Sequence, residues 1–122
     1  MEYQEIVLSS TELFFFMIKG LAKFSTGAYI LKSPYDWVYA LNGQIHRDGG
    51  PAQISIITYN VSGKNDYCFK YYSQGKLHNE NGPAMIVYSM NQGDPIVEDY
   101  YLNGERLEQH KWQQQVQTKL YW

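Results

Sequence analysis

The sequence of 122 residues is poor in cysteine, contains no long apolar run and carries almost no excess of charge. The single cysteine, Cys68, excludes an intramolecular disulfide and is typical of a reducing compartment. The longest apolar run is the six-residue segment 13–18, whereas a membrane-spanning helix needs about 20 residues. The first ten residues carry acidic groups where a signal peptide carries basic ones. We therefore expect a cytosolic protein with no membrane partner.

Charge and motif content narrow the function classes further. Ten basic and twelve acidic residues are interspersed and leave a net charge of −2. A nucleic-acid-binding protein generally carries a basic patch, so we expect no direct nucleic-acid partner. The sequence has no phosphate-binding loop, no dinucleotide-binding glycine motif, no paired Cys-x-x-Cys and no nucleophile elbow. These absences favour a protein that is not an enzyme and holds no cofactor.

The sequence is, by contrast, rich in apolar residues and in tyrosine. Hydrophobic residues make up 44% of the chain, enough for the core of one domain. Twelve tyrosines indicate either aromatic pairs across a sheet or a surface made for binding.

Residues 9–24 show the pattern of a helix. Ser9 and Glu12 have the spacing of a capping box, in which each side chain binds the backbone N–H of the other residue. Apolar residues then recur at helical spacing: Leu13, Phe16, Met17, Leu21 and Phe24. Phe14 and Ile18 widen this apolar face. Two interpretations stay open: a helix buried against a sheet, or a helix that keeps part of its face for a partner or a dimer contact.

From residue 37 the spacing of apolar residues changes from helical to alternating, which predicts strands at 37–41, 53–59, 67–72, 85–90 and 96–102. Asn42-Gly43, Gln74-Gly75 and Asn103-Gly104 predict tight turns. We predict a single α+β domain in three parts: an N-terminal helix and lead-in (1–36), an antiparallel β-meander of two to three hairpin repeats (37–107), and a C-terminal capping helix (108–122).

The segment 43–54, GQIHRDGGPAQI, returns 32 residues later as 75–86, GKLHNENGPAMI. A third, shorter copy begins with YYLNGE at 100–105, but Leu107 stands where the histidine would be and no Gly-Pro-Ala follows. A degenerate last copy that leads into a helix is typical of the end of a repeat array.

This pattern resembles the tandem repeats of the form NGxLHRxxGPA found in tailed phages and giant viruses, which are grouped loosely with MORN-type β-hairpin repeats. The resemblance covers residues 37–112. It implies an antiparallel meander of hairpins, a viral or phage origin, and interaction rather than catalysis. Arg47 follows the family pattern, whereas Asn79 replaces the arginine in the second copy.

The repeated histidines and carboxylates allow two interpretations. His46 with Asp48, and His78 with Glu80, have the residue types of an acid–base pair or a metal site. A catalytic group is normally unique, however, so two copies favour a structural turn. In that case the histidine donates to a backbone carbonyl, the carboxylate accepts backbone N–H groups, and the glycine before each proline adopts a conformation that other residues avoid. The predicted structural residues are Gly43, His46, Gly50, Pro51, Gly75, His78, Gly82, Pro83 and Gly104.

Tyrosines on the sheet are the candidates for partner binding. If one face of the sheet packs on the helix, the opposite face should carry a subset of Tyr59, Tyr72, Tyr88 and Tyr101. The alternative is a set of cross-strand ladders that only stabilise the sheet. Glu98 and Asp99 offer an acidic edge to a basic partner, or simply face water.

Three functions follow as hypotheses. The first is a small phage- or virus-encoded module that binds a host protein in the host cytoplasm, for example as a steric, anti-CRISPR-like inhibitor that blocks a subunit of a defence complex. The second is a structural or assembly protein that forms homo-oligomers. The third is a protein that sequesters a small ligand between the repeat loops, with His46 and His78 as polar contacts.

Overall fold

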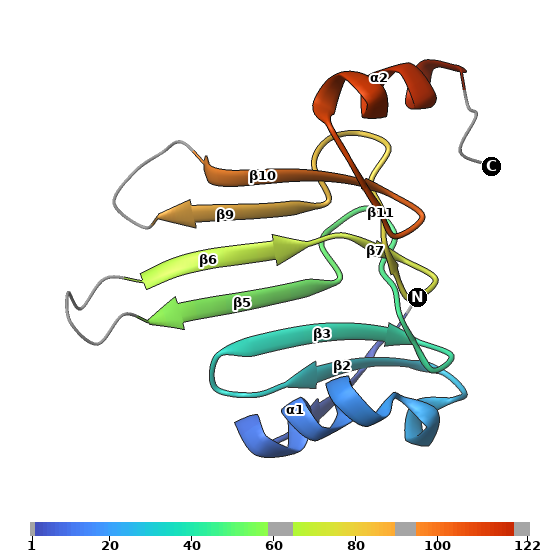
Figure 1. The fold of residues 1–122 in the computed structure, drawn as a ribbon. Coiled ribbons are helices and arrows are strands. Elements are labelled where there is room, and N and C mark those ends of the chain that lie inside the picture. The colour runs from blue at the N-terminus through green and yellow to red at the C-terminus, as the bar shows by residue number, and fades with distance from the viewer. Residues whose placement is uncertain (1, 59–64, 90–94, 119–122) are drawn as a thin grey trace.

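The computed structural model describes residues 2–58, 65–89 and 95–118, which form a small α+β protein with two helices and a mostly antiparallel sheet (Figure 1). The predicted α+β class is thereby confirmed. The elements are β1 (Gln4–Val7), α1 (Ser10–Lys19), a 3-10 turn (Ala22–Phe24), β2 (Ala28–Lys32), β3 (Asp36–Leu41), β4 (Gln44–Ile45), β5 (Gln53–Thr58), β6 (Asn65–Lys70), β7 (Tyr72–Ser73), β8 (Lys76–Leu77), β9 (Met85–Ser89), β10 (Pro95–Leu102), β11 (Glu105–Leu107) and α2 (Gln109–Thr118).

The main sheet has the strand order β1-β2-β3-β5-β6-β9-β10-β11. Only β1 and β2 pair in parallel, while the pairs from β2 onward are antiparallel. The assignment of residues 1–36 to a helix and lead-in was incomplete, because this region also supplies β1 and β2. Both strands lack the alternation of a half-exposed strand: β1 has four residues, and β2 is a short apolar run that β1 and β3 flank on both sides.

Helix α1 begins as predicted and ends earlier. The backbone N–H of Glu12 donates to the Ser9 side chain at 3.1 Å, and the Glu12 carboxylate accepts the Ser9 N–H at 3.0 Å. The helix stops at Gly20, whose φ of 100° lies outside the helical region. Leu21 and Phe24 therefore reach the core from the 3-10 turn and not from a continuous helix.

The apolar core lies between α1 and the first three strands, where α1 runs along β2 and β3 (Figure 1). Its buried members are Leu13, Leu21, Phe24, Leu31, Val38 and Ala40. We call residues 4–41 the helix-covered half, and the sheet face that carries Leu31 and Val38 the helix face. These large side chains leave water almost completely, which is the dominant stabilising term in folding.

Residues 44–107, here called the repeat half, have a different interior. The helices α1 and α2 lie at opposite ends of the sheet in Figure 1, and the core cluster contains no residue of β5, β6, β9 or β10. Most of the buried apolar side chains here are small: Ala52, Cys68 and Ala84, with Leu102 as the larger exception. The strand register places Ile54, Phe69 and Ile86 on the face opposite α1, which we call the open face.

Helix α2 lies beyond β10 at the end of the sheet opposite α1 (Figure 1). Its Trp112 ring packs at a tilt against Tyr100 with a centroid distance of 4.8 Å, and Trp112 Nε1 donates to the Asn79 carbonyl at 2.8 Å. The last four residues of the predicted helix, 119–122, lie outside the described residues. Neither described helix has the length and hydropathy needed to cross a bilayer.

Candidate functional site

Three tight turns with the same backbone conformation organise the repeat half. The turn pairs Asn42-Gly43, Gln74-Gly75 and Asn103-Gly104 all have positive φ at both residues, with values of 49–51° at the first and 81–85° at the second. Two-residue hairpins need this conformation, because it matches the twist of the flanking strands. The predicted roles of Gly43, Gly75 and Gly104 are confirmed.

Each repeat histidine joins its own loop to the turn of the next copy. His46 Nδ1 accepts the backbone N–H of Gln74 at 3.0 Å, and His78 Nδ1 accepts that of Asn103 at 2.9 Å. Because Nδ1 accepts, the ring proton lies on Nε2. Nε2 then donates to the neighbouring carboxylate, Asp48 at 3.1 Å or Glu80 at 3.3 Å.

The histidines are therefore structural connectors, but the predicted hydrogen bonds were wrong. The ring accepts a backbone N–H instead of donating to a backbone carbonyl. The carboxylate accepts from the ring instead of from backbone amides. The reason is distance along the chain: the partner amide lies 28 residues away for His46 and 25 for His78, and a local pattern cannot show it.

The glycine that needs a special conformation is Gly49, with φ of 80°, and not Gly50 or Gly82, which have no positive φ. Gly50 instead leaves room for Arg47, because a Cβ at Gly50 would lie 3.0 Å from the guanidinium carbon. Arg47 donates to the Pro51 carbonyl at 3.2 Å, and Asn79 donates to the Pro83 carbonyl at 3.0 Å. The two side chains thus make equivalent hydrogen bonds to the proline carbonyl, which explains why Asn79 can replace the arginine.

This arrangement offers little to a metal or to acid–base chemistry. Within the described residues there is no group of three or more His, Cys, Asp or Glu side chains placed to hold a metal ion. Both ring nitrogens of His46 and of His78 are already occupied by hydrogen bonds. His110 lies exposed on α2, 3.4 Å from Glu108.

The candidate tyrosines do not gather on one face. Tyr88 pairs with Tyr67 across β6 and β9 on the open face, where its ring contacts Phe69 at 5.8 Å. Tyr72 and Tyr101 lie on the helix face, which their alternation with Lys70 and Asp99 requires. Tyr59 lies outside the described residues.

The two acidic candidates, Glu98 and Asp99, also lie on different faces of the sheet. Glu98 lies opposite Ile86 and points to the open face, whereas Asp99 lies opposite Met85 on the helix face. Asp99 accepts a hydrogen bond from Arg106 at 2.9 Å, so its charge is already paired. The six predicted partner-binding residues therefore do not form one surface.

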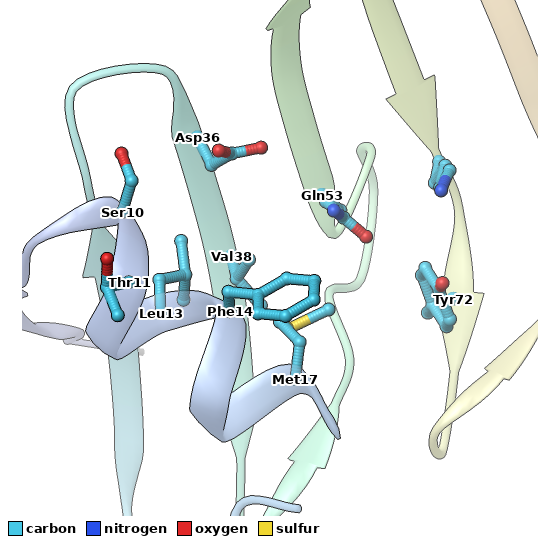
Figure 2. Close-up of a pocket in the computed structure, with 10 residues that line it drawn as sticks. Ser10, Thr11, Leu13, Phe14, Met17, Asp36, Val38, Gln53 and Tyr72 are labelled. Atoms are coloured by element: carbon cyan, nitrogen blue, oxygen red, sulfur yellow. The ribbon is translucent and has the colours of Figure 1, made fainter. Parts of the chain in front are cut away.

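A cleft of about 580 Å³ lies between α1 and the helix face of β3, β5 and β6. We call it the α1 cleft. Leu13, Phe14 and Met17 form its helix wall, and Val38 lies at its base (Figure 2). Across from them stand the polar side chains of the sheet: Asp36, Gln53, Lys70 and Tyr72. Apolar walls with a few polar groups are typical of ligand sites.

Hydrogen bonds fix part of this polar wall. Ser55 donates its hydroxyl proton to Asp36 at 2.6 Å and accepts the Gln53 side-chain amide at a long 3.5 Å. Gln53 Oε1 is consequently left buried and without a hydrogen-bond partner. Burial is the main cause that raises the pKa of Tyr72 above its ordinary value, with smaller contributions from Cys68 and Tyr101.

Helix α1 also exposes a set of large apolar side chains, which begins at the cleft wall with Phe14. Phe14, Phe15 and Ile18 are 66%, 55% and 63% exposed, and we call them the α1 stripe. They lie within one and a half turns of the helix, so they are adjacent in space. Lys19, which follows Ile18, is exposed, and so is Lys23, whose ammonium group lies 5.8 Å from the centroid of the Phe16 ring; we call these two residues the basic rim.

Comparisons with models of protein families, with curated proteins and with solved structures find no match to this chain.

Sequence reasoning missed the α1 cleft. Alternation correctly places Cys68, Lys70 and Tyr72 on one face of their strand, and helical spacing brings Leu13 and Met17 together. No local pattern tells which face of the strand meets the helix, because that depends on the pairing register of four strands.

Proposed function

We propose that this chain is a non-catalytic protein-binding module that contacts its partner through the α1 stripe. The observation that carries the proposal is the exposure of Phe14, Phe15 and Ile18 together on one short helix. Contiguous exposed apolar side chains with a polar rim are typical of protein-interaction sites. Large aromatic residues are also the common anchors of such sites.

The helix that carries the stripe is held in place on its other side. Leu13 is buried in the core, Phe16 packs edge-on against Phe24 at 5.2 Å, and the capping box fixes the first turn. A rigid anchor loses little conformational entropy on binding. The basic rim of Lys19 and Lys23 favours a partner surface that has acidic residues around an apolar centre.

A narrower form of the proposal concerns origin and mechanism. The resemblance of the repeat to phage and giant-virus repeats supports a virus-encoded protein that acts on a host protein in the host cytoplasm. On this proposal the chain inhibits by covering a functional surface, and a subunit of a bacterial defence complex is the expected class of target. It holds no cofactor.

We also infer that the two copies of the motif are units of a hairpin repeat, from which the sheet grows as a meander. Three pairs of equivalent hydrogen bonds support this inference. They join histidine to carboxylate, histidine to the next turn, and Arg47 or Asn79 to the proline carbonyl.

The test is capture of proteins from a bacterial lysate by the tagged chain, with quantitative mass spectrometry of what is retained. The wild type is compared with the double variant Phe15→Ser and Ile18→Ser. Ile96→Ser is the matched control, since Ile96 is an equally exposed apolar residue on β10. We expect a protein that the wild type and the control retain and the α1 variant loses at least tenfold. Equal retention by the α1 variant would contradict the proposal, as would no retention by the wild type.

One observation favours self-association as a second candidate. Strand β1 is an edge of the sheet, and its Val7 is 80% exposed. An uncovered edge strand can pair with the same strand of another copy. Light scattering after size exclusion tests this candidate: it predicts a dimer that Val7→Lys converts to a monomer, and a wild-type monomer at high concentration would rule it out.

A further inference from the structure

The two walls of the α1 cleft differ in chemistry. Phe14 and Met17 present apolar surface from the helix, and Val38 continues that surface onto β3 (Figure 2). The wall formed by β6 and β7 presents an ammonium group and a phenol, from Lys70 and Tyr72. An occupant that satisfies both walls has an apolar body and a polar end.

The charge of that polar end follows from Lys70. Its side chain is half-buried, yet no carboxylate lies within 4.0 Å of its ammonium group among the described residues. Lysine side chains are mostly exposed in folded proteins. An anionic group in the cleft would supply the missing partner and form a charge-assisted hydrogen bond.

The one carboxylate of the cleft does not serve Lys70. Asp36 accepts hydrogen bonds from the hydroxyl groups of Ser55 at 2.6 Å and Ser33 at 3.4 Å. The register places Asp36 opposite Ser55, and Lys70 opposite Gln53, so strand β5 separates the two charges. The Lys70 end of the cleft is therefore the end suited to an anion.

We propose that the α1 cleft binds a small apolar monocarboxylate. The carboxylate accepts hydrogen bonds from Lys70 Nζ and from the Tyr72 hydroxyl, while the apolar body lies against Phe14, Met17 and Val38. Tyr72 is suited to donate because a phenol is protonated at neutral pH. A volume of about 580 Å³ lies within the range of roughly 300–1,000 Å³ that is usual for small-molecule sites. The site shares Phe14 with the α1 stripe, so the variants that separate the two sites change only Phe15 and Ile18.

The experiment uses the full chain and three matched probes: 4-phenylbutanoate, 4-phenylbutan-1-ol and 4-phenylbutylammonium. Calorimetry gives the dissociation constants, and backbone amide shifts map the bound site. We expect the carboxylate to bind at least tenfold more tightly than the alcohol and the ammonium, with the largest shifts in α1, β5 and β6. Equal affinity for the three probes, no binding, or shifts elsewhere would overturn the proposal.

Variants assign the preference to named side chains. Lys70→Met keeps most of the apolar stem and removes the charge. We therefore expect this variant to bind the carboxylate and the alcohol with about equal affinity. Lys111→Met, at an exposed position on α2, should leave the preference for carboxylate over alcohol unchanged. Unchanged preference in a folded Lys70→Met would overturn the assignment, and the wild-type probe series decides the question if that variant does not fold.

Two further arms separate this site from the partner contact and from a peptide site. Phe15→Ser with Ile18→Ser should abolish protein capture and leave probe binding intact, so the two proposals fail independently. Acetyl-Ala-Ala-Phe with a free carboxylate is compared with 4-phenylbutanoate. Binding of the peptide alone would contradict a small-molecule site, whereas binding of 4-phenylbutanoate at equal or higher affinity supports it.

Discussion

The two halves of this molecule achieve burial in different ways. In the helix-covered half, large side chains such as Leu31, Val38 and Phe24 are sealed between α1 and three strands. In the repeat half, Ala52, Ala84 and Cys68 are buried, and the large apolar side chains of the open face keep contact with water. The first half has an apolar core, and the second relies on its sheet and on the connections between its loops.

The difference teaches where the repeated motif acts. His46 and His78 each connect one loop to the next turn, and the alanine of each Gly-Pro-Ala is completely buried. Only a small side chain fits there, because packed interiors leave no room for added methylene groups. The motif thus supplies order to a part of the sheet that lies outside the apolar core cluster.

We expect the largest loss of stability from a substitution in the core of the helix-covered half. Leu31→Ala should lower the free energy of unfolding by about 3 kcal/mol, because it opens a cavity at a side chain with 0% exposure. Ile57→Ala, at 39% exposure on β5, should cost less than about 1 kcal/mol. Urea unfolding followed by circular dichroism gives both values, and equal costs would contradict the comparison.

The connections of the repeat half come next. His46→Ala and His78→Ala should each lower the free energy of unfolding by about 1–2 kcal/mol, because each leaves a turn amide and a carboxylate without the ring. His110→Ala is the control and should change it by less than about 0.5 kcal/mol. If all three variants cost the same, the connector role is wrong.

A smaller effect, of opposite sign, tests the turns. Gln74 has φ of 51° in a position where the other two turns have asparagine. Asparagine tolerates positive φ better than glutamine, so Gln74→Asn should raise the free energy of unfolding by about 0.5 kcal/mol. The reverse change, Asn42→Gln, should lower it. Thermal unfolding gives the change in stability of both variants, and two changes of the same sign would contradict this prediction.

The smallest effect concerns pH and the first turn of α1. The hydrogen bonds from the Ser9 backbone and side chain lower the pKa of Glu12 from its ordinary value of 4.5. A lowered pKa in the folded state means stabilisation that is present above about pH 4.5 and disappears as the pH falls through the lowered value. Glu12→Gln should therefore show a flatter fall in melting temperature between pH 5 and about pH 3. An unchanged slope would exclude this contribution.

Local patterns in the sequence predicted much of the fold. The capping box, the three turns with positive φ and the approximate places of the strands after residue 37 all follow from neighbouring residues. Helical spacing extended the predicted helix to residue 24, whereas the helix ends at Gly20. Strands β1 and β2 were not predicted, because their sequences do not alternate and only their pairing with neighbouring strands shows them to be strands.

The site was harder to predict than the fold. A subset of Tyr59, Tyr72, Tyr88 and Tyr101 was expected on the face away from the helix, but the sequence could not tell which. Tyr88 lies there and Tyr72 does not, because alternation fixes faces within a strand and only the register relates one strand to another. The histidine contacts and the α1 cleft likewise join segments that are far apart in the sequence. The widened apolar face of the first helix was the one sequence signal that pointed to the α1 stripe.

Native-state hydrogen exchange tests the central comparison most directly, because it reports the opening free energy of each backbone amide. The account predicts that amides of β2 and β3, next to the core, exchange only through global unfolding. Amides of β9 and β10, which contribute no residue to the apolar core cluster, should exchange through smaller openings and at least tenfold faster. Equal protection in both halves, or greater protection in β9 and β10, would contradict the account.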